Sequence, residues 1–175
     1  YLAIVAVGAG AGRAASVAAH GPLPDFGTIT FPLTQHPKDR KRMFACVHPR
    51  DVARLAPRDA ETTYRVLQRF SRHDGTPLAL VEARAPRALR HQIRVHLAAL
   101  GSPLLGDGLY GGPQDSILGR HALHASRIAW PGSVELPAFV VDAALPDDLA
   151  SIVQPVDGQS AASAPSHSHN RDQSS

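Results

Sequence analysis

The sequence has little cysteine, few aromatic residues and no long hydrophobic run. Its single cysteine, Cys46, excludes an internal disulfide framework and fits a reducing cytoplasm. No segment approaches the roughly 18 consecutive apolar residues that a membrane span requires. The apolar opening, residues 1–7, lacks the basic start of a signal peptide and is too short for one. The 175 residues are enough for one compact domain with a core.

Lysine is also scarce, because Lys38 and Lys41 are the only two and arginine carries the rest of the positive charge. The net charge is +3 and the isoelectric point is near 9.5. A mildly basic chain is compatible with a nucleic-acid partner, and arginine can contact phosphate with two parallel hydrogen bonds. The same arginine bias, together with the many alanines, can equally come from a GC-rich coding sequence.

The hydrophobic pattern predicts an α+β domain around a largely antiparallel sheet. We expect strands over 1–7, 28–31, 43–47, 61–70, 78–83, 122–130 and 138–144, a loop over 8–27, and helices over 90–100 and 146–153. Gly101 follows the first helix at the position where glycine ends helices. We predict one domain over 1–153 and a disordered tail over 154–175, where Ser, Pro, His and Gln replace apolar residues.

The most specific segment is residues 90–111, with the sequence RHQIRVHLAALGSPLLGDGLYG. It reads as a helix with cationic and imidazole side chains followed by a glycine-rich return. The segment resembles the RluA family of RNA pseudouridine synthases, whose pattern is H-Q-I-R-V-H-L, then G-H-P, then G-D-x-x-Y-G. Ser102 stands here where the family usually has histidine.

Four further segments resemble the same family in the family's own order. They are a Tyr-x-Ala-x-Val strand at 1–5, a G-x-I-x-x-P-L turn at 27–33, an A-x-T-x-Y-x-V-L strand at 60–67 and an R-H-A-L-H-A strand at 120–125. The resemblance covers residues 1 to about 150. It implies the pseudouridine synthase catalytic fold.

The resemblance also implies an isomerase that detaches uracil from its ribose and rejoins it through carbon 5. The family uses an aspartate, a tyrosine and a basic residue, without a metal or cofactor. On that pattern Tyr1 is the tyrosine of the pocket and Arg94 is the cation that meets the aspartate. A buried carboxylate stays ionised and oriented when a cation pairs with it. The implied partner is ribosomal or transfer RNA, and we expect a cytoplasmic monomer.

The remaining site predictions concern contacts with RNA. We expect them from Arg87, Arg90, His91 and Gln92 in the helix region, and from Lys38, Arg40 and Arg42 in the basic loop. Leu89 stands where the family has a further arginine, so Arg87 or Arg90 is expected to replace it. The basic loop is also typical of an ordinary solvated turn.

The family's aspartate motif, H-R-L-D-x-x-T-S-G, has no counterpart in the sequence. The segment His48–Asp51 is a lookalike, but Pro49 breaks its pattern and no Thr-Ser-Gly follows. Asp107 is expected to cap the glycine-rich loop or to pair with an arginine. We therefore expect a chain truncated at its N-terminal side and inactive by itself.

Other interpretations remain open. The chain could be a non-catalytic RNA-binding remnant of the same fold, Tyr1 a core residue and Arg94 a surface helix residue. A metal-dependent hydrolase built on His91, His96, His121 and His124 is disfavoured, because no spacing matches a structural zinc site. We expect these histidines to be hydrogen-bonded structural residues. The sequence does not identify the RNA or the uridine.

Overall fold

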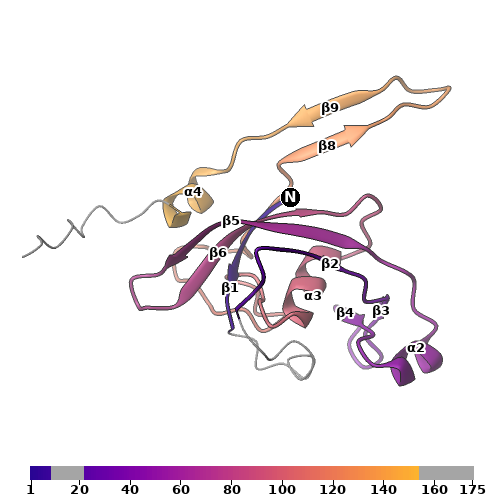
Figure 1. The fold of residues 1–175 in the computed structure, drawn as a ribbon, viewed down its shortest axis with the longest axis horizontal. Helices are drawn as coiled ribbons and strands as arrows, with labels where there is room; N and C mark the ends of the chain where they lie inside the picture. Colours follow the sequence, from indigo (N-terminus) through magenta and orange to yellow (C-terminus); the bar gives the residue numbers. More distant parts are fainter. Residues whose placement is uncertain (9–21, 154–175) are drawn as a thin grey trace, which may run out of the picture.

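A five-stranded sheet forms the centre of the molecule in a computed structural model that describes residues 1–8 and 22–153 (Figure 1). The strand order is β2-β5-β6-β1-β7, and every pair of neighbours is antiparallel. The strands are β1 (Leu2–Ala6), β2 (Phe26–Ile29), β5 (Thr62–Ser71), β6 (Pro77–Arg84) and β7 (Leu123–His124). The expected α+β fold with an antiparallel sheet is confirmed.

Strand β1 lies inside the sheet, and its apolar sequence explains why. Leu2 to Ala6 pair with Glu82 to Leu78 of β6, whereas β7 pairs only with Leu2 and Ala3. Further along that edge, Ile4 donates its N–H to Ala122, and Ala6 donates to Pro103. Both edges of β1 are therefore hydrogen-bonded. Alternate side chains point to opposite faces of a strand, so a strand covered on both faces must be apolar throughout.

Two layers cover the sheet. Helix α3 (Gln92–Ala99) packs Ile93 and Leu97 against Ala3 and Val5 on one face. The other face buries Ile4 and Ala6 against Leu105, Leu118 and Leu149, the last from helix α4 (Asp147–Val153). Figure 1 shows the two helices on opposite sides of β1 and β6. The sheet is thus the shared wall of two cores, and both predicted helices are confirmed within two residues.

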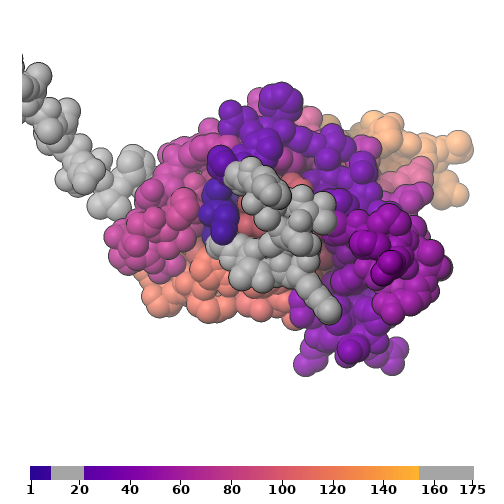
Figure 2. All heavy atoms as spheres, turned by 60° about the horizontal axis from the view of Figure 1, so that its bottom comes forward, coloured from indigo at the N-terminus to yellow at the C-terminus, as the bar shows by residue number. Residues whose placement is uncertain are grey.

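A small lobe carries the basic loop beside helix α3. It consists of β3 (Leu33–Gln35), β4 (Met43–Ala45) and helix α2 (Pro49–Leu55), and it forms part of the purple end of the molecule in Figure 2. The sequence analysis missed α2, which buries none of its residues and so shows no apolar stripe. The helix begins because Pro49 occupies its first turn and His48 caps it by accepting the N–H of Arg50.

The strand over 28–31 is shifted by two residues, the single strand over 122–130 is wrong, and β3 was not predicted. The expected strand over 28–31 is β2 at Phe26–Ile29, because β2 pairs with Thr62–Arg65 and stops where β5 starts. The expected strand over 122–130 is two strands in different sheets. After β7 the chain leaves β1 and forms β8 (Arg127–Trp130), which pairs only with β9 (Phe139–Asp142).

The hairpin β8–β9 extends away from the rest of the molecule (Figure 1). All eight of its strand residues are exposed. Most of the predicted loop, residues 9–21, and the predicted tail, 154–175, lie outside the described residues. Over the described ranges, no helix has the length and apolar character needed to cross a bilayer.

Candidate functional site

The centre of the site is an ion pair between Arg94 on α3 and Asp107 in the glycine-rich loop. Arg94 donates from Nε to Oδ2 and from Nη2 to Oδ1, each at 2.7 Å. The two side chains are only 12% and 1% exposed. A bidentate pair in such surroundings is strong and fixed in geometry, and it raises the pKa of Arg94 chiefly through the hydrogen bonds to Asp107. Asp107 therefore pairs with an arginine, as one of its two expected roles.

Two glycines let the loop bring Asp107 under Arg94. A Cβ at Gly106 would collide with the backbone carbonyl of Arg120, and one at Gly112 would collide with that of Leu104. The carbonyl of Asp107 accepts the N–H groups of Tyr110 and Gly112, at 3.1 and 2.8 Å. The turn is thus closed by its own backbone, which explains the glycine spacing of the motif.

Tyr110 links the loop to α3 and to the basic lobe. Its ring lies 5.1 Å from the Cζ of Arg94 and 5.7 Å from the Cζ of Arg42. Its hydroxyl accepts the N–H of Met43 at 2.8 Å and lies 3.0 Å from Nδ1 of His91. Burial raises the pKa of this hydroxyl. The sequence analysis missed Tyr110, although its place in the G-D-x-x-Y-G motif was a signal for it.

His91 takes an unusual backbone conformation at the start of α3. Its φ of 55° is left-handed, a region that residues other than glycine occupy infrequently and that surrounding contacts can constrain a residue to hold. The contact with Tyr110 is one such constraint. Because the tyrosine hydroxyl already accepts from Met43, its own proton is available for His91 Nδ1. Burial, together with the nearby Arg94 and Arg90, lowers the pKa of His91.

Gln92, by contrast, is turned into the protein. Its amide nitrogen donates to the carbonyl of Glu61 and to the hydroxyl of Thr62, and its amide oxygen accepts the N–H of Leu89. The residue is 2% exposed. Its contact with RNA stays a prediction, and these bonds give it a structural role at the start of α3.

Arg90 connects helix α3 to the basic loop that carries three of the predicted RNA-binding cations. Arg90 donates to the backbone carbonyls of Arg40 and Lys41, at 3.3 and 3.2 Å, and so ties the basic turn to α3. Lys38, Arg40 and Arg87 are exposed, whereas Arg42 is half-buried beside Tyr110. In the described part of the chain, the Nε of Arg42 is the buried side-chain atom without a hydrogen-bond partner.

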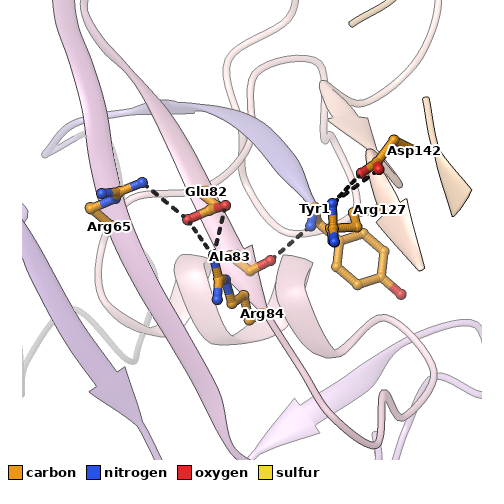
Figure 3. A network of polar contacts seen from close by, with 7 residues as sticks. All are labelled: Tyr1, Arg65, Glu82, Ala83, Arg84, Arg127 and Asp142. Atoms are coloured by element: carbon orange, nitrogen blue, oxygen red, sulfur yellow. Dashed lines mark hydrogen bonds and ion pairs between the residues drawn. The ribbon is translucent and has the colours of Figure 1, made fainter. Parts of the chain in front are cut away.

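Tyr1, the other predicted pocket residue, directly precedes β1 at the end of this interior strand. Its backbone nitrogen donates to the carbonyl of Ala83 at 2.8 Å (Figure 3). The ring packs partly against the core on the α3 side of the sheet. Among the described residues no hydrogen bond joins Tyr1 to Arg94, so its pocket role stays a prediction. Nearby on β6, Glu82 pairs with Arg65 and Arg84.

His96 and His124 make side-chain hydrogen bonds as expected, whereas within the described residues His121 makes none. His96 is 0% exposed and lies between the Thr62 hydroxyl and the Phe31 carbonyl, both at 2.9 Å. Since a carbonyl only accepts, Nε2 carries the proton and Nδ1 accepts from Thr62. His124 lies 3.3 Å from the carbonyl of Ala143. Over residues 1–8 and 22–153, no cluster of His, Cys, Asp or Glu could hold a metal ion.

Comparison with known proteins decides the family. The chain is 33% identical over 157 residues to "Ribosomal large subunit pseudouridine synthase D" of Xanthomonas campestris pv. campestris, a match that covers 82% of this chain and 44% of that protein. The protein of the same name from Nitrosomonas europaea is 32% identical, with coverages of 78% and 38%. The chain belongs to the RluA-type RNA pseudouridine synthase family. No family model matches it.

Solved structures agree with this RluA-type assignment at the level of the fold. The human RNA pseudouridylate synthase domain containing 1 superposes with a TM-score of 0.58 at 20% identity, covering 89% of this chain and 61% of that one. Human RNA pseudouridylate synthase domain containing 4 gives 0.52 at 23% identity, with coverages of 85% and 58%. The chain spans less than half the length of the curated RluA-type relatives described above.

Proposed function

We propose that this chain is the part of an RNA pseudouridine synthase that holds the basic side of the catalytic pocket. The single observation that carries the proposal is Arg94, a nearly buried cation fixed at one edge by Asp107 in a chain of this family. A fixed cation can keep a catalytic carboxylate ionised and oriented. Arg94 is the catalytic cation of the proposal, and Tyr1 is the ring that packs against the base.

The reaction is an isomerisation of uridine. The bond between N1 of the base and C1′ of the ribose breaks, and a bond between C5 and C1′ forms. The proton on C5 leaves and N1 gains one, so the atoms balance without a cofactor, a metal or an oxidant. The base must leave the RNA stack for this chemistry, and an aromatic ring such as that of Tyr1 can support the flipped base.

The substrate class we propose is ribosomal RNA of the large subunit, supported by the names of two of the most similar relatives. The cations Lys38, Arg40, Arg87 and Arg90 are exposed where RNA phosphates could reach them. We place the reaction in the cytoplasm, supported by the single cysteine, and expect a monomer.

The chain by itself supplies no nucleophile in this proposal. Both oxygens of Asp107 accept hydrogen bonds from Arg94, so this carboxylate is engaged and 1% exposed at the side chain. Asp51, from the lookalike segment, lies in the first turn of α2 and pairs with Arg54 at 3.6 Å. We therefore expect no isomerisation by the isolated 175-residue chain, and detectable activity of that chain would contradict this part of the proposal.

The test uses RNA labelled with tritium at C5 of uridine, because isomerisation releases that tritium into water. The complete gene product should release it, and Arg94→Ala should slow the release by at least about 100-fold. Arg65→Ala is the matched control, since Arg65 is 66% exposed on the sheet and lies outside the site. A complete gene product that binds RNA but releases no tritium would favour the non-catalytic remnant.

A further inference from the structure

The Arg94 guanidinium uses only one of its edges inside the protein. Nε and Nη2 donate to Asp107, and within the described residues Nη1 donates to no group. Among the described residues, Arg42 Nε is the one buried side-chain nitrogen or oxygen atom that lacks a hydrogen-bond partner. Nη1 of Arg94 also lacks a partner, so it is not buried and solvent can reach it. One edge of the cation is thus bound from behind while the other faces outward.

The bound edge is fixed at three points. Asp107 holds it with two bonds of 2.7 Å, and the Tyr110 ring covers the guanidinium at 5.1 Å. Tyr110 is itself held between Met43 of β4 and His91 at the start of α3. An arginine has many rotamers in solution, and each such contact removes some of that freedom before a ligand binds.

We propose that Asp107 is a positioning residue that, with the Tyr110 ring, presents the Nη1 edge of Arg94 to the reacting groups. This inference rests on the proposed function. Asp107 acts through Arg94 and touches neither RNA nor base. Its charge matters as well as its shape, because a neutral side chain would leave a nearly buried guanidinium without its counter-ion.

The decisive variant is Asp107→Asn in the complete gene product. Asparagine keeps the shape but has one acceptor oxygen and no charge, so the guanidinium loses its fixed plane. We expect kcat to fall about 100-fold while KM for RNA changes little, since the exposed cations that contact phosphate are unaltered. A folded Asp107→Asn protein with the kcat of the wild type would overturn the inference.

The matched control is Asp148→Asn. Asp148 accepts two bonds of 2.9 Å from Arg120, which is the same bidentate geometry, but the two side chains are 42% and 38% exposed and lie outside the site. This variant should keep the wild-type kcat. An equal loss in both variants would assign the effect to ion pairs in general and would refute a special role for Asp107.

A second measurement separates this inference from the proposed function. In nitrogen-15 NMR spectra the Nε–H of Arg94 should exchange with water more slowly than that of Arg120, and Asp107→Asn should remove the difference. This readout needs no activity. If the wild type forms no pseudouridine but its Arg94 Nε–H exchanges slowly with water, only the proposed function is refuted. If the Arg94 Nε–H exchanges as fast as that of Arg120, the positioning role of Asp107 is refuted.

Should Asp107→Asn fail to fold, the pair Tyr110→Phe and Tyr110→Leu replaces it. Phenylalanine keeps the ring over Arg94, whereas leucine removes it. We expect the leucine variant to lose at least about tenfold more kcat than the phenylalanine variant. Equal kcat values in two folded variants would overturn the role of the ring.

Discussion

The pairs Arg94–Asp107 and Arg127–Asp142 join the same two side-chain types in opposite surroundings. The first lies between α3 and the glycine-rich loop, with side chains 12% and 1% exposed. The second lies across the hairpin β8–β9, with side chains 61% and 63% exposed and a contact of 2.9 Å. Exposed pairs contribute about 0 to 1 kcal/mol, whereas breaking a buried pair costs about 3 to 5 kcal/mol. Burial, more than contact distance, therefore determines how much stability is lost when each pair is broken.

The apolar side chains of the two regions show the same contrast. Ile128, Trp130, Phe139 and Val141 lie on one face of the hairpin, yet each is 40% to 56% exposed. On α3, Ile93 and Leu97 are 4% and 0% exposed. An alternating strand pattern thus gives a hairpin an apolar face, but only a neighbouring layer buries that face. Four predictions test how far this difference between α3 and β8–β9 extends.

The largest difference is expected for core truncation. Leu97→Ala should lower the free energy of unfolding by about 4 kcal/mol, because it removes a fully buried side chain and leaves a cavity. Ile128→Ala should lower it by no more than about 0.5 kcal/mol, because Ile128 is already 56% exposed. Urea unfolding of both variants measures the difference. A large effect at Ile128 would show that the hairpin face is covered in solution.

The two regions also differ at a glycine with positive φ. Gly106→Ala should cost about 3 kcal/mol, since alanine is strained at a φ of 73° and its Cβ would meet the carbonyl of Arg120. Gly132→Ala in the hairpin should cost about 1 to 2 kcal/mol, because its φ of 96° is also unfavourable but the nearest atom is 3.0 Å away in an exposed turn. Equal losses of stability in thermal or urea unfolding would show that the two glycines do not differ in this way.

Of the two regions compared, only the α3 side should make the free energy of unfolding depend on pH through histidine, because residues 127–142 contain none. Burial lowers the pKa of His96, so the unfolded chain binds a proton near pH 6.5 and the folded protein does so only at lower pH. This contribution to stability is complete above about pH 6.5 and is lost as the pH falls below it. The slope should reach at most about 1.4 kcal/mol per pH unit for this histidine.

Urea unfolding between pH 7.5 and 5 measures that slope in the wild type and in His96→Gln, where it should be shallower. It should not vanish, because burial also lowers the pKa values of His91 and His121. His73→Gln, an exposed residue in the turn between β5 and β6, is the control and should keep the wild-type slope. An unchanged slope in His96→Gln would contradict the proton assignment.

The smallest effect is expected for Asp142→Asn. It breaks the Arg127 pair, but both partners stay in water and should lose no more than about 0.5 kcal/mol. Raising the salt concentration should reduce the difference further, since salt screens exposed charges. A loss above about 2 kcal/mol in urea unfolding would mean that another part of the protein covers this pair.

Much of the fold was predictable because local patterns carry it. The apolar run of β1, the spacing of Ile93, Leu97 and Leu100, and Gly101 after α3 each reflect the geometry of one element. Helix α2 escaped prediction because it buries nothing, so it has caps but no apolar stripe. The split between β7 and β8 could not be predicted, because it arises from their different partners. Strand β7 pairs with β1, whereas β8 pairs with β9.

The sequence by itself predicted the family and the α+β class, and it predicted Arg94 as the cation of the pocket and Asp107 as a loop cap or the partner of an arginine, since ordered motifs and periodicity are local properties. Only the tertiary structure decided that these two residues form one buried pair under Tyr110, and that Gln92 turns inward. The physical reason is that burial and hydrogen-bond partners come from segments far apart in the chain. Thirteen positions separate Arg94 from Asp107, and 67 separate Met43 from Tyr110, so these partners meet only in the folded chain.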